Sequence, residues 1–288
     1  MTMLKASPPA WTDAALQALQ SFVRRHPRLF VITGAGCSTA AGIPDYRDVD
    51  GNWKRPQPVT YQAFMGDVAT RRRYWARSLI GWPVMAHARP GAAHRALAAL
   101  EGAGRIELLV TQNVDGLHQA AGSRQIVDLH GRVDEVRCMH CETRSPRAAL
   151  QAELLRRNPA WAELQAAAAP DGDADLEGRD FAGFEVPACA HCGNGPLKPD
   201  VVFFGENVPR GRVDAAHAAL ERADAVLVAG SSLMVYSGYR FVQAAVQRGL
   251  PVAAVNQGRT RADAVLALKV EQDVGQALQA VADGFSAS

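Results

Sequence analysis

Hydrophobic and polar positions along the chain follow two alternating patterns. Strand-length apolar runs recur from one end to the other, namely Leu29 to Thr33, Ile106 to Thr111, Val201 to Phe204, Ala225 to Ala229 and Val252 to Asn256. Alanine-rich segments with helical spacing, such as Val213 to Ala223, separate the later runs. Strands that alternate with helices are typical of a parallel sheet covered on both faces. We therefore predict an α/β fold with a doubly wound, Rossmann-like parallel sheet.

Two segments interrupt this alternation. Residues from about 61 to 100 read mainly as helices, and the first strand is followed by a glycine-rich loop and a plausible helix start. Between Cys138 and Cys192 short turns surround an insert in which Pro170 to Asp173 is expected to be a surface loop. We divide the chain into a Rossmann-like domain, residues 1–132 and 198–288 with the helical insert, and an inserted module, residues 133–197.

Composition limits the classes of function that need to be considered. The 288 residues are 48% hydrophobic and 21% charged, which is enough apolar side chain for a large core and a small one. Thirty-one basic and twenty-nine acidic residues leave a net charge of +2, which gives no support for a nucleic-acid partner. We find neither a membrane-length apolar run nor a signal-like N-terminus, and we expect a soluble, cytoplasmic protein that binds no membrane.

Cysteine spacing carries the clearest chemical signal. Four of the five cysteines form two identical pairs, Cys138-x-x-Cys141 and Cys189-x-x-Cys192. Each pair can sit on one tight turn, so that four thiolates converge on a tetrahedral zinc ion. Two unrelated buried or redox-active pairs are the alternative. A closed site with four thiolates has no position for a reacting water, so we predict one structural Zn²⁺ per chain.

The glycine-rich loop after the first strand is, on its own, weak evidence for a dinucleotide-binding site. Gly34 and Gly36 are followed by Thr39 where the common dinucleotide fingerprint has a third glycine, and no clear acid follows about 20 residues later. A tight turn that needs small residues would explain the loop equally well.

Six ordered motifs resemble the sirtuin family and, in finer features such as Val235 to Arg240, its class II branch. They extend over nearly the whole chain, from the glycine-rich loop to the last strands. The motifs are Gly34 to Arg47, Thr111 to His118, Leu129-His130-Gly131, the two cysteine pairs, Pro199 to Glu206, and Gly230 to Leu233 with Val255-Asn256.

The resemblance implies that NAD lies across the carboxyl ends of the strands. Small residues at Gly34 and Gly36 would let backbone N–H groups approach the diphosphate, with a helix N-terminus behind them. Ile43, Asn113 and Asp115 would surround the nicotinamide. The implied NAD-binding residues are Gly34, Ala35, Gly36, Ser38, Thr39, Ile43, Pro44, Asp45, Tyr46, Arg47, Gln112, Asn113, Val114, Asp115, His130, Gly230, Ser231, Ser232, Asn256, Gln257, Gly258 and Val274.

The activity implied by the resemblance is NAD-dependent deacylation of lysine, with His130 and Asn113 as catalytic residues. The acyl oxygen displaces nicotinamide at the ribose, and His130 as general base then deprotonates a ribose hydroxyl, giving free lysine and O-acyl-ADP-ribose. The partner is an acylated protein or peptide, whose extended backbone pairs with the segments around Phe204, Gly205, Glu206 and Val235. His94 and His118 are interpreted as structural.

Tyr74-x-x-Arg77 has the spacing that pairs with acidic acyl groups in another sirtuin branch, and two helix-surface residues are the equally weighted alternative. The enzyme could therefore prefer acyl groups other than acetyl. Mono-ADP-ribosyl transfer to protein uses the same NAD cleavage and remains open. A zinc-ribbon interaction module and an NAD sensor without turnover are less consistent with the charge and with the presence of His130.

Overall fold

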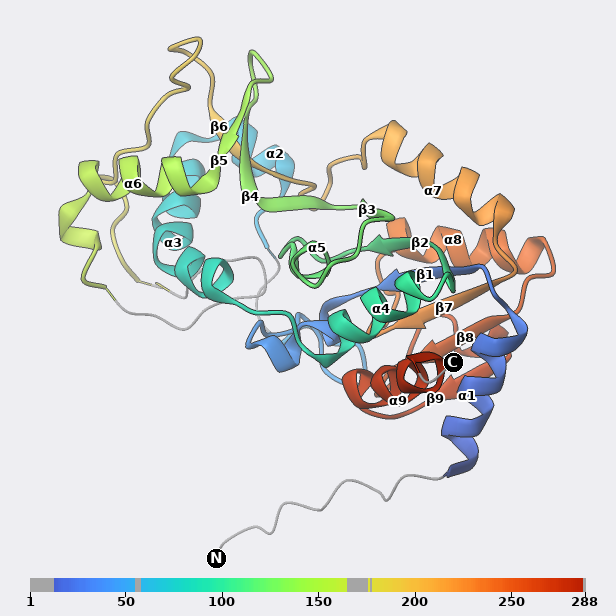
Figure 1. Ribbon diagram of the computed structural model, residues 1–288. Helices are drawn as coiled ribbons and strands as arrows, with labels where there is room; N and C mark the ends of the chain where they lie inside the picture. Colours follow the sequence, from blue (N-terminus) through green and yellow to red (C-terminus); the bar gives the residue numbers. More distant parts are fainter. Residues whose placement is uncertain (1–12, 55–57, 165–175, 177, 287–288) are drawn as a thin grey trace, which may run out of the picture.

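The computed structural model contains a large parallel sheet and, beside it, a smaller antiparallel sheet (Figure 1). It describes residues 13–54, 58–164, 176 and 178–286, and the predicted surface loop from Pro170 to Asp173 lies outside these ranges. Over the described residues the large sheet has six strands, in spatial order β3 (Ile126–Asp128), β2 (Ile106–Thr111), β1 (Leu29–Thr33), β7 (Ala225–Ala229), β8 (Val252–Val255) and β9 (Leu268–Val270).

Every neighbouring pair in the large sheet is parallel, which confirms the predicted doubly wound fold. The chain builds outward from β1 in one direction through β2 and β3, and then in the other direction through β7, β8 and β9. The strand order therefore reverses between β1 and β7. In open α/β sheets a crevice forms at this reversal, outside the carboxyl ends of the strands.

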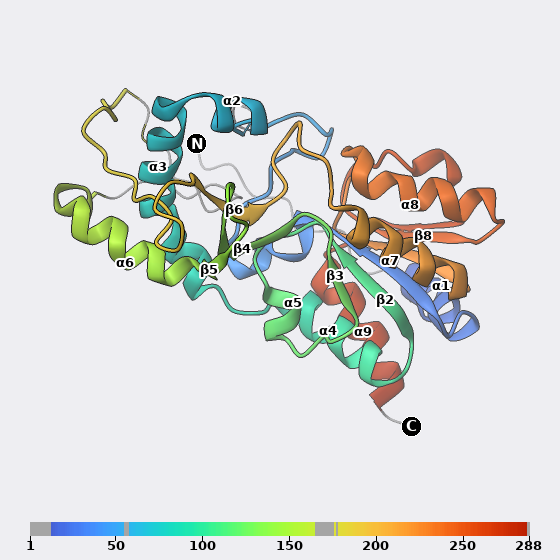
Figure 2. The ribbon, with the colours of Figure 1, turned by 90° about the horizontal axis from the view of Figure 1, so that it is seen from above.

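Successive side chains along each strand point to opposite faces of the large sheet and contribute to two apolar layers. Leu29 and Val31 of β1 face one layer, whereas Phe30 and Ile32 face the other, and all four are fully buried. Helices on both faces cover these layers (Figure 2). The first face carries α1 (Asp13–Arg25), α4 (Ala92–Gly102) and α9 (Val274–Ser286), and the second carries α7 (Arg210–Arg222) and α8 (Tyr236–Gln247). Burial on both faces explains why the strands are continuous apolar runs.

The second sheet and three helices form what we call the small lobe. Its strands are β5 (Arg144–Pro146), β4 (Gly131–Cys138) and β6 (Leu197–Val201), and its helices are α2 (Tyr61–Gly66), α3 (Val68–His87) and α6 (Arg147–Arg157). Phe64, Trp75 and Leu154 are fully buried in its core. The helical insert is thus split, because α4 packs on the large sheet. The module bounds 133–197 stay a prediction.

Shorter elements complete the described chain. They are α5 (Leu117–Ala120) and the 3₁₀ turns η1 (Ala35–Cys37), η2 (Thr39–Ala41), η3 (Pro159–Trp161) and η4 (Asp263–Val265). Among the described residues, we find no helix whose length and apolar character would let it cross a bilayer.

The prediction of a parallel strand from Val201 to Phe204 is wrong. The strand here, β6, ends at Val201 and pairs antiparallel with β4 in the small lobe. Beyond it the chain leaves the sheet and turns at Gly205, whose φ is +79°. An apolar run of this length shows that a segment is buried, but not which sheet it joins.

The helix predicted after Gly36 is also wrong. The chain makes η1 and η2 there, and the next α-helix after β1 is α2, which begins at Tyr61. Gly42, with φ +85°, ends the second turn. Two short 3₁₀ turns have no aligned helix dipole comparable to that of a long helix, so the expected positive helix end behind the loop is missing.

Candidate active site

A cavity of about 870 Å³ opens where the strand order reverses and extends to the small lobe. Its size is that of pockets that hold a large cofactor or ligand. Its walls come from the segments that follow β1, β2, β7 and β8, from the start of α8, and from the chain after β6. All of the predicted catalytic, cofactor-binding and substrate-binding residues line this cavity except Gly258, Tyr74 and Arg77.

The glycines of the first loop serve a different purpose from the predicted one. A Cβ on Gly36 would lie 2.9 Å from the Gly230 Cα, and one on Gly34 would lie 2.8 Å from the Ser231 Cβ. The N–H groups of Gly34 and Gly36 already donate to the carbonyl oxygens of Ala229 and Gly230. These glycines therefore let the loops after β1 and β7 touch, and their own N–H groups are not free for a diphosphate.

The Ser38 hydroxyl organises the polar end of the cavity. It donates to Asp115 Oδ2 at 2.6 Å and accepts from Asn113 Nδ2 at 3.0 Å. The same Asn113 amide also donates to the Gly34 carbonyl oxygen at 3.0 Å. Because each group is held by two others, the amide and the carboxylate keep fixed directions at the cavity wall.

His94 and His118 lie behind this cluster, fully buried, with ring centroids 4.6 Å apart. His94 Nδ1 accepts from the Gly91 N–H at 3.1 Å, so Nε2 carries the proton and faces Ser38 Oγ at 3.4 Å. Burial lowers the pKa of His94, and it lowers the pKa of His118 to about 3. Both rings are neutral at pH 7, as structural histidines would be.

His130 also lines the cavity, two residues after the end of β3 and directly before the first residue of β4. Its Nδ1 lies 3.0 Å from the carbonyl oxygen of Gln112. Burial lowers the pKa of His130 to about 4, and the hydrogen bond to Gln112 opposes that shift only in part. The imidazole is therefore neutral at pH 7 and can accept a proton, which is what a general base must do.

The segment after β6 forms the wall nearest the small lobe. The Phe204 carbonyl oxygen accepts from the Tyr61 N–H at 2.9 Å, and Glu206 Oε2 accepts from the Phe203 N–H at 2.9 Å. Lys198, almost fully buried, places Nζ 3.0 Å from the same carboxylate oxygen. A buried ion pair thus holds the turn that presents Phe204 to the cavity.

Three predicted residues lie outside the cavity wall. Tyr74 is buried in the small-lobe core, where its ring packs 5.3 Å from that of Phe203, which does line the cavity. Arg77 is on the same helix, α3. Gly258, with φ +82°, packs against the Val49 backbone, where a Cβ would collide with the carbonyl oxygen. Its position supports the loop that contains Val49 rather than the cavity directly.

The structure adds lining residues that sequence reasoning did not assign. They are Trp53, Met85, Tyr236, Ser237, Arg240 and Asp273, among others. Ser237 and Arg240 belong to the segment from Val235 to Arg240, which resembles one sirtuin branch and in which only Val235 was predicted to have a role. Only their place on the first turns of α8, which faces the cavity, identifies them as site residues.

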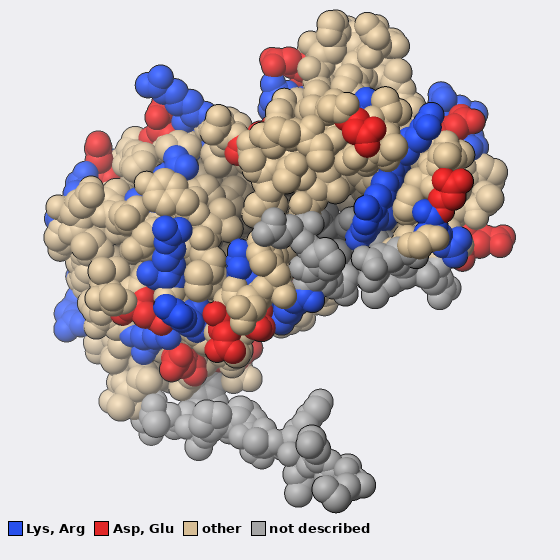
Figure 3. Space-filling view, turned by 180° about the vertical axis from the view of Figure 1, so that it is seen from behind, with Lys and Arg blue, Asp and Glu red and all other residues tan. Residues whose placement is uncertain are grey.

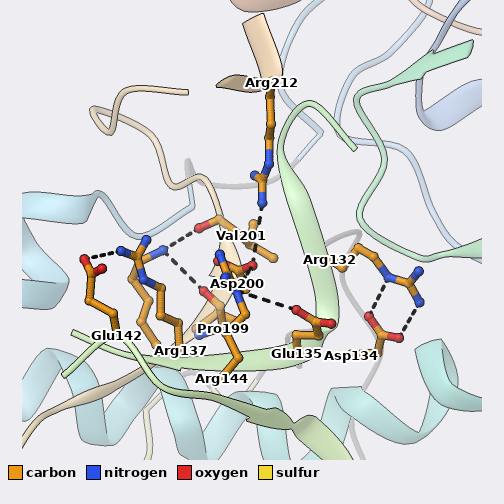
Figure 4. A network of polar contacts seen from close by, with 11 residues as sticks. Arg132, Asp134, Glu135, Arg137, Glu142, Arg144, Pro199, Asp200, Val201 and Arg212 are labelled. Atoms are coloured by element: carbon orange, nitrogen blue, oxygen red, sulfur yellow. Dashed lines mark hydrogen bonds and ion pairs between the residues drawn. The ribbon is translucent and has the colours of Figure 1, made fainter. Parts of the chain in front are cut away.

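Asp200 connects the small lobe to the large sheet (Figure 4). Its carboxylate accepts from Arg144 Nε of β5 at 3.0 Å and lies 3.6 Å from Arg212 NH2 of α7. The carboxylate is largely buried, so the two guanidinium groups offset much of the cost of desolvation. This network lies next to Gly131, at the start of β4.

The four predicted cysteines come together at the tip of the small lobe, as expected. Their Sγ atoms all lie within 4.8 Å of one another, with Cys138 to Cys192 and Cys141 to Cys189 both at 3.7 Å. A tetrahedron with Zn–S bonds of about 2.3 Å has sulfur atoms about 3.8 Å apart. The cluster therefore has the ligands and the spacing of a structural zinc site.

Charges on the molecular surface are mixed in sign. On the face seen in Figure 3, Lys and Arg side chains lie among Asp and Glu side chains. Exposed pairs such as Arg28 with Asp224, 2.7 Å apart, reflect this mixing.

Comparison with known proteins gives consistent matches along most of the chain. Residues 34–237 match the Sir2 family. The chain is 69% identical over 261 residues to the NAD-dependent protein deacetylase of Xanthomonas campestris pv. campestris (strain 8004), covering 91% of this chain and 89% of that protein. It is 65% identical over 266 residues to the NAD-dependent protein deacetylase of Bordetella bronchiseptica, covering 92% and 97%.

Solved structures agree at lower sequence identity. A structure of Sir2 with a p53 peptide and NAD⁺ has a TM-score of 0.76 and 29% identity, covering 95% of this chain and 99% of the other. A Sir2 homologue in complex with NAD has a TM-score of 0.71 and 29% identity, covering 94% of each chain.

Proposed function

Because the chain belongs to the Sir2 family, we propose that its cavity binds NAD together with an acylated lysine and that the enzyme removes the acyl group. The chain is an NAD-dependent protein deacetylase of the sirtuin type, since it is 65–69% identical to proteins of that name over most of their length. The observation that supports its chemistry best is the neutral His130 in the same cavity as the Ser38, Asn113 and Asp115 cluster.

NAD fits the donor set of this cavity. Asp115 and Asn113, both held by Ser38, offer a carboxylate oxygen and an amide oxygen that could accept from the N–H groups of a carboxamide such as that of nicotinamide. Ser231 and Asn256, which follow β7 and β8, would hold the adenosine half. NAD supplies a ribose carbon from which nicotinamide can be displaced. The four-cysteine cluster would hold zinc far from this chemistry, as a structural ion.

His130 would take the proton from a ribose hydroxyl. Its Nδ1 faces a carbonyl oxygen, which can only accept, so the ring presents Nε2 as the basic atom. The base is pre-formed, because burial already keeps the ring neutral. The products would be nicotinamide, free lysine and O-acyl-ADP-ribose.

The peptide would bind between the segment around Phe204 to Glu206 and the segment that ends at Val235. Both line the cavity, and neither is part of a regular sheet on the side that faces it. An extended peptide that pairs with such segments through its backbone is held with little dependence on its own sequence. We therefore expect several acylated proteins to be substrates.

Selectivity for the acyl group stays a prediction. Neither Tyr74 nor Arg77 lines the cavity, and Tyr74 packs against Phe203, so Tyr74 could act on an acyl chain only if the chain reached past that ring. Comparing Arg77→Ala with the parent on acetyl-lysine and succinyl-lysine peptides tests the idea. Selective loss on the succinyl peptide would support it, and equal loss on both would refute it.

The decisive experiment is mass spectrometry of acyl-lysine peptides incubated with the purified protein, with and without NAD. We expect NAD-dependent loss of the acyl group and a matching amount of O-acyl-ADP-ribose, and neither with His130→Asn. If ADP-ribose appeared on protein while every peptide kept its acyl group, the activity would be mono-ADP-ribosyl transfer instead.

The proposed compartment is the cytoplasm. Zinc binding requires all four cysteines as thiolates, which a reducing compartment preserves. Cell fractionation with an antibody to the chain would test this placement.

A further inference from the structure

The first turn of α8 reaches the catalytic histidine. Ser237 Oγ lies 2.7 Å from His130 Nε2, although the two residues are 107 positions apart in the sequence. Both line the cavity. This distance is in the normal range for a hydrogen bond from a hydroxyl, and the contact engages the nitrogen that must act as the base.

The partners of the two ring nitrogens determine where the protons are. The Gln112 carbonyl oxygen, 3.0 Å from Nδ1, can only accept, so Nδ1 carries the proton. Nε2 then has a lone pair, and the Ser237 hydroxyl must donate to it. Ser237 therefore recognises the neutral ring in the tautomer that leaves Nε2 basic.

The next residue of α8, Gly238, packs against Gln112, whose carbonyl oxygen faces Nδ1 on the other side of the His130 ring. A Cβ on Gly238 would lie 2.5 Å from Gln112 Oε1, so the helix packs directly on the Gln112 side chain. Gln112 Nε2 in turn donates to Ser231 Oγ at 2.8 Å. The start of α8 thus positions both the hydroxyl at Nε2 and, through Gln112, the carbonyl at Nδ1.

The charged groups around His130 act in the same direction as this hydroxyl. Burial is the main cause of the lowered pKa of His130, and the cations of Arg212 on α7 and Arg240 on α8 lower it further. Arg212 is partly neutralised by Asp200. A hydrogen bond that only the neutral ring can accept also disfavours protonation.

We propose that Ser237 is a positioning residue for His130, which holds the imidazole with Nδ1 protonated and Nε2 directed into the cavity. The inference rests on the proposed function. When the ribose hydroxyl reaches Nε2, the serine hydroxyl turns away and keeps its own proton. The substrate O–H bond breaks, the Nε2–H bond forms, and His130 becomes an imidazolium ion.

Two rates separate this role from a general effect on the site. Exchange of labelled nicotinamide into NAD in the presence of acyl peptide requires both ligands and the displacement step, but not the base. Release of deacylated peptide requires the base as well. Ser237→Ala should therefore keep nicotinamide exchange within about twofold and reduce deacylation kcat about tenfold, which is part of the roughly 10²–10⁴-fold that a general base contributes.

The pH profile gives a second readout. Without the serine hydroxyl the neutral ring loses a stabilising donor, so the pKa of His130 rises and the acid limb of log kcat moves to higher pH. Ser237→Thr keeps a hydroxyl and should restore both kcat and the acid limb. Ser21→Ala, which removes an exposed hydroxyl on α1, is the matched control and should change neither.

Two results would overturn the inference. In the first, Ser237→Ala has the wild-type kcat and acid limb. In the second, Ser237→Ala lowers the rate of nicotinamide exchange, the rate of deacylation and the melting temperature, which would show that Ser237 only stabilises the fold. Failure of the proposed function itself is distinguishable, because the wild-type protein would then release no deacylated peptide, and the inference would fall with it.

Discussion

The indole of Trp53 meets the ring of Phe204 nearly edge to face, with ring centroids 5.5 Å apart. Trp53 lies on the loop that lines the predicted NAD end of the cavity, and the Arg47 guanidinium stacks 4.0 Å above its ring. Phe204 belongs to the segment predicted to bind peptide. The walls predicted for the two ligands are thus in direct contact.

Replacing Trp53 should weaken both ligands together. We expect Trp53→Ala to raise KM for NAD and KM for the peptide by about three- to tenfold each, since an aromatic pair contributes about 0.5–1.5 kcal/mol. Trp53→Phe should retain most of the contact. Steady-state kinetics with each ligand varied in turn measures the effect, and a rise confined to NAD would contradict the coupling.

The buried pair of Lys198 and Glu206 should matter for stability and for peptide binding. Glu206→Gln leaves the lysine charged and unpaired, which should cost about 3 kcal/mol at pH 7 and raise the peptide KM. Burial already lowers the pKa of Lys198 below its unfolded value, so the lost stability should partly return as pH rises toward 10.

Urea unfolding of Glu206→Gln and of the double variant Lys198→Met/Glu206→Gln tests this account. The double variant leaves no buried charge and should be more stable than Glu206→Gln alone. A double variant that is less stable would show that the lysine does not depend on its carboxylate.

Acid should destabilise the fold through its buried histidines. Burial lowers the pKa of His118 to about 3 in the folded chain, whereas the unfolded chain titrates near 6.5. As pH falls through that interval the unfolded state binds the proton first, so stability is present above about pH 6.5 and is lost below it. From pH 7 to pH 5 this one residue should remove about 2 kcal/mol.

His118→Leu should reduce that loss by about the same amount, and His94 and His130 should account for much of what remains. Free energies of unfolding at pH 7 and pH 5 measure it. An unchanged difference between the two pH values would mean that His118 does not titrate on unfolding.

Gly131 should tolerate no side chain. Its φ is +84°, and an added Cβ would collide with the Asp200 carbonyl oxygen. Gly249 has φ +72° with no atom within 4 Å of an added Cβ, so Gly249→Ala isolates the backbone cost of about 1–2 kcal/mol. Gly131→Ala should lose clearly more in thermal unfolding, and equal losses would show that the backbone at Gly131 relaxes freely.

Zinc should bind with one ion per chain and stabilise the small lobe. Cys189→Ala should lose the metal and lower both melting temperature and activity, since a structural zinc site contributes directly to folding. Cys37→Ala is the matched control, because Cys37 is buried outside the cluster. Metal analysis of both proteins, with a melting curve before and after a chelator, would reveal zinc loss from the control if the assignment were wrong.

The sequence predicted best what depends on local spacing. Two identical Cys-x-x-Cys pairs have the spacing of a four-thiolate zinc site, so the spacing alone predicted their cluster. The parallel character of the large sheet also followed from apolar runs that alternate with helices, although the short strands β3 and β9 were not predicted. The helix expected after Gly36 failed because small residues favour a tight turn and close packing against Gly230 as readily as a helix start.

Contacts between distant segments could not be predicted in this way. Ser237 touches His130 because α8, which follows β7, begins at the same cavity that the chain after β3 reaches, and no spacing encodes that distance. Tyr74 and Arg77 illustrate the reverse case, since their spacing is compatible with a paired site while their helix places Tyr74 behind Phe203. A pattern along one helix defines which residues share a face, but the packing of the helix defines what that face meets.

His130 sits where the two sheets are joined. Before it, the Leu129 N–H donates to Thr111 of the large sheet, and beside it the His130 carbonyl oxygen accepts from the Val202 N–H at 2.8 Å, next to the first pairing of β4 with β6. His130 is therefore held by backbone hydrogen bonds at the connection between the two sheets. A partner that binds the small lobe, even at its four-cysteine cluster, and tilts it would move His130 Nε2 relative to the large sheet. Such a partner would change the turnover rate although it binds away from the cavity.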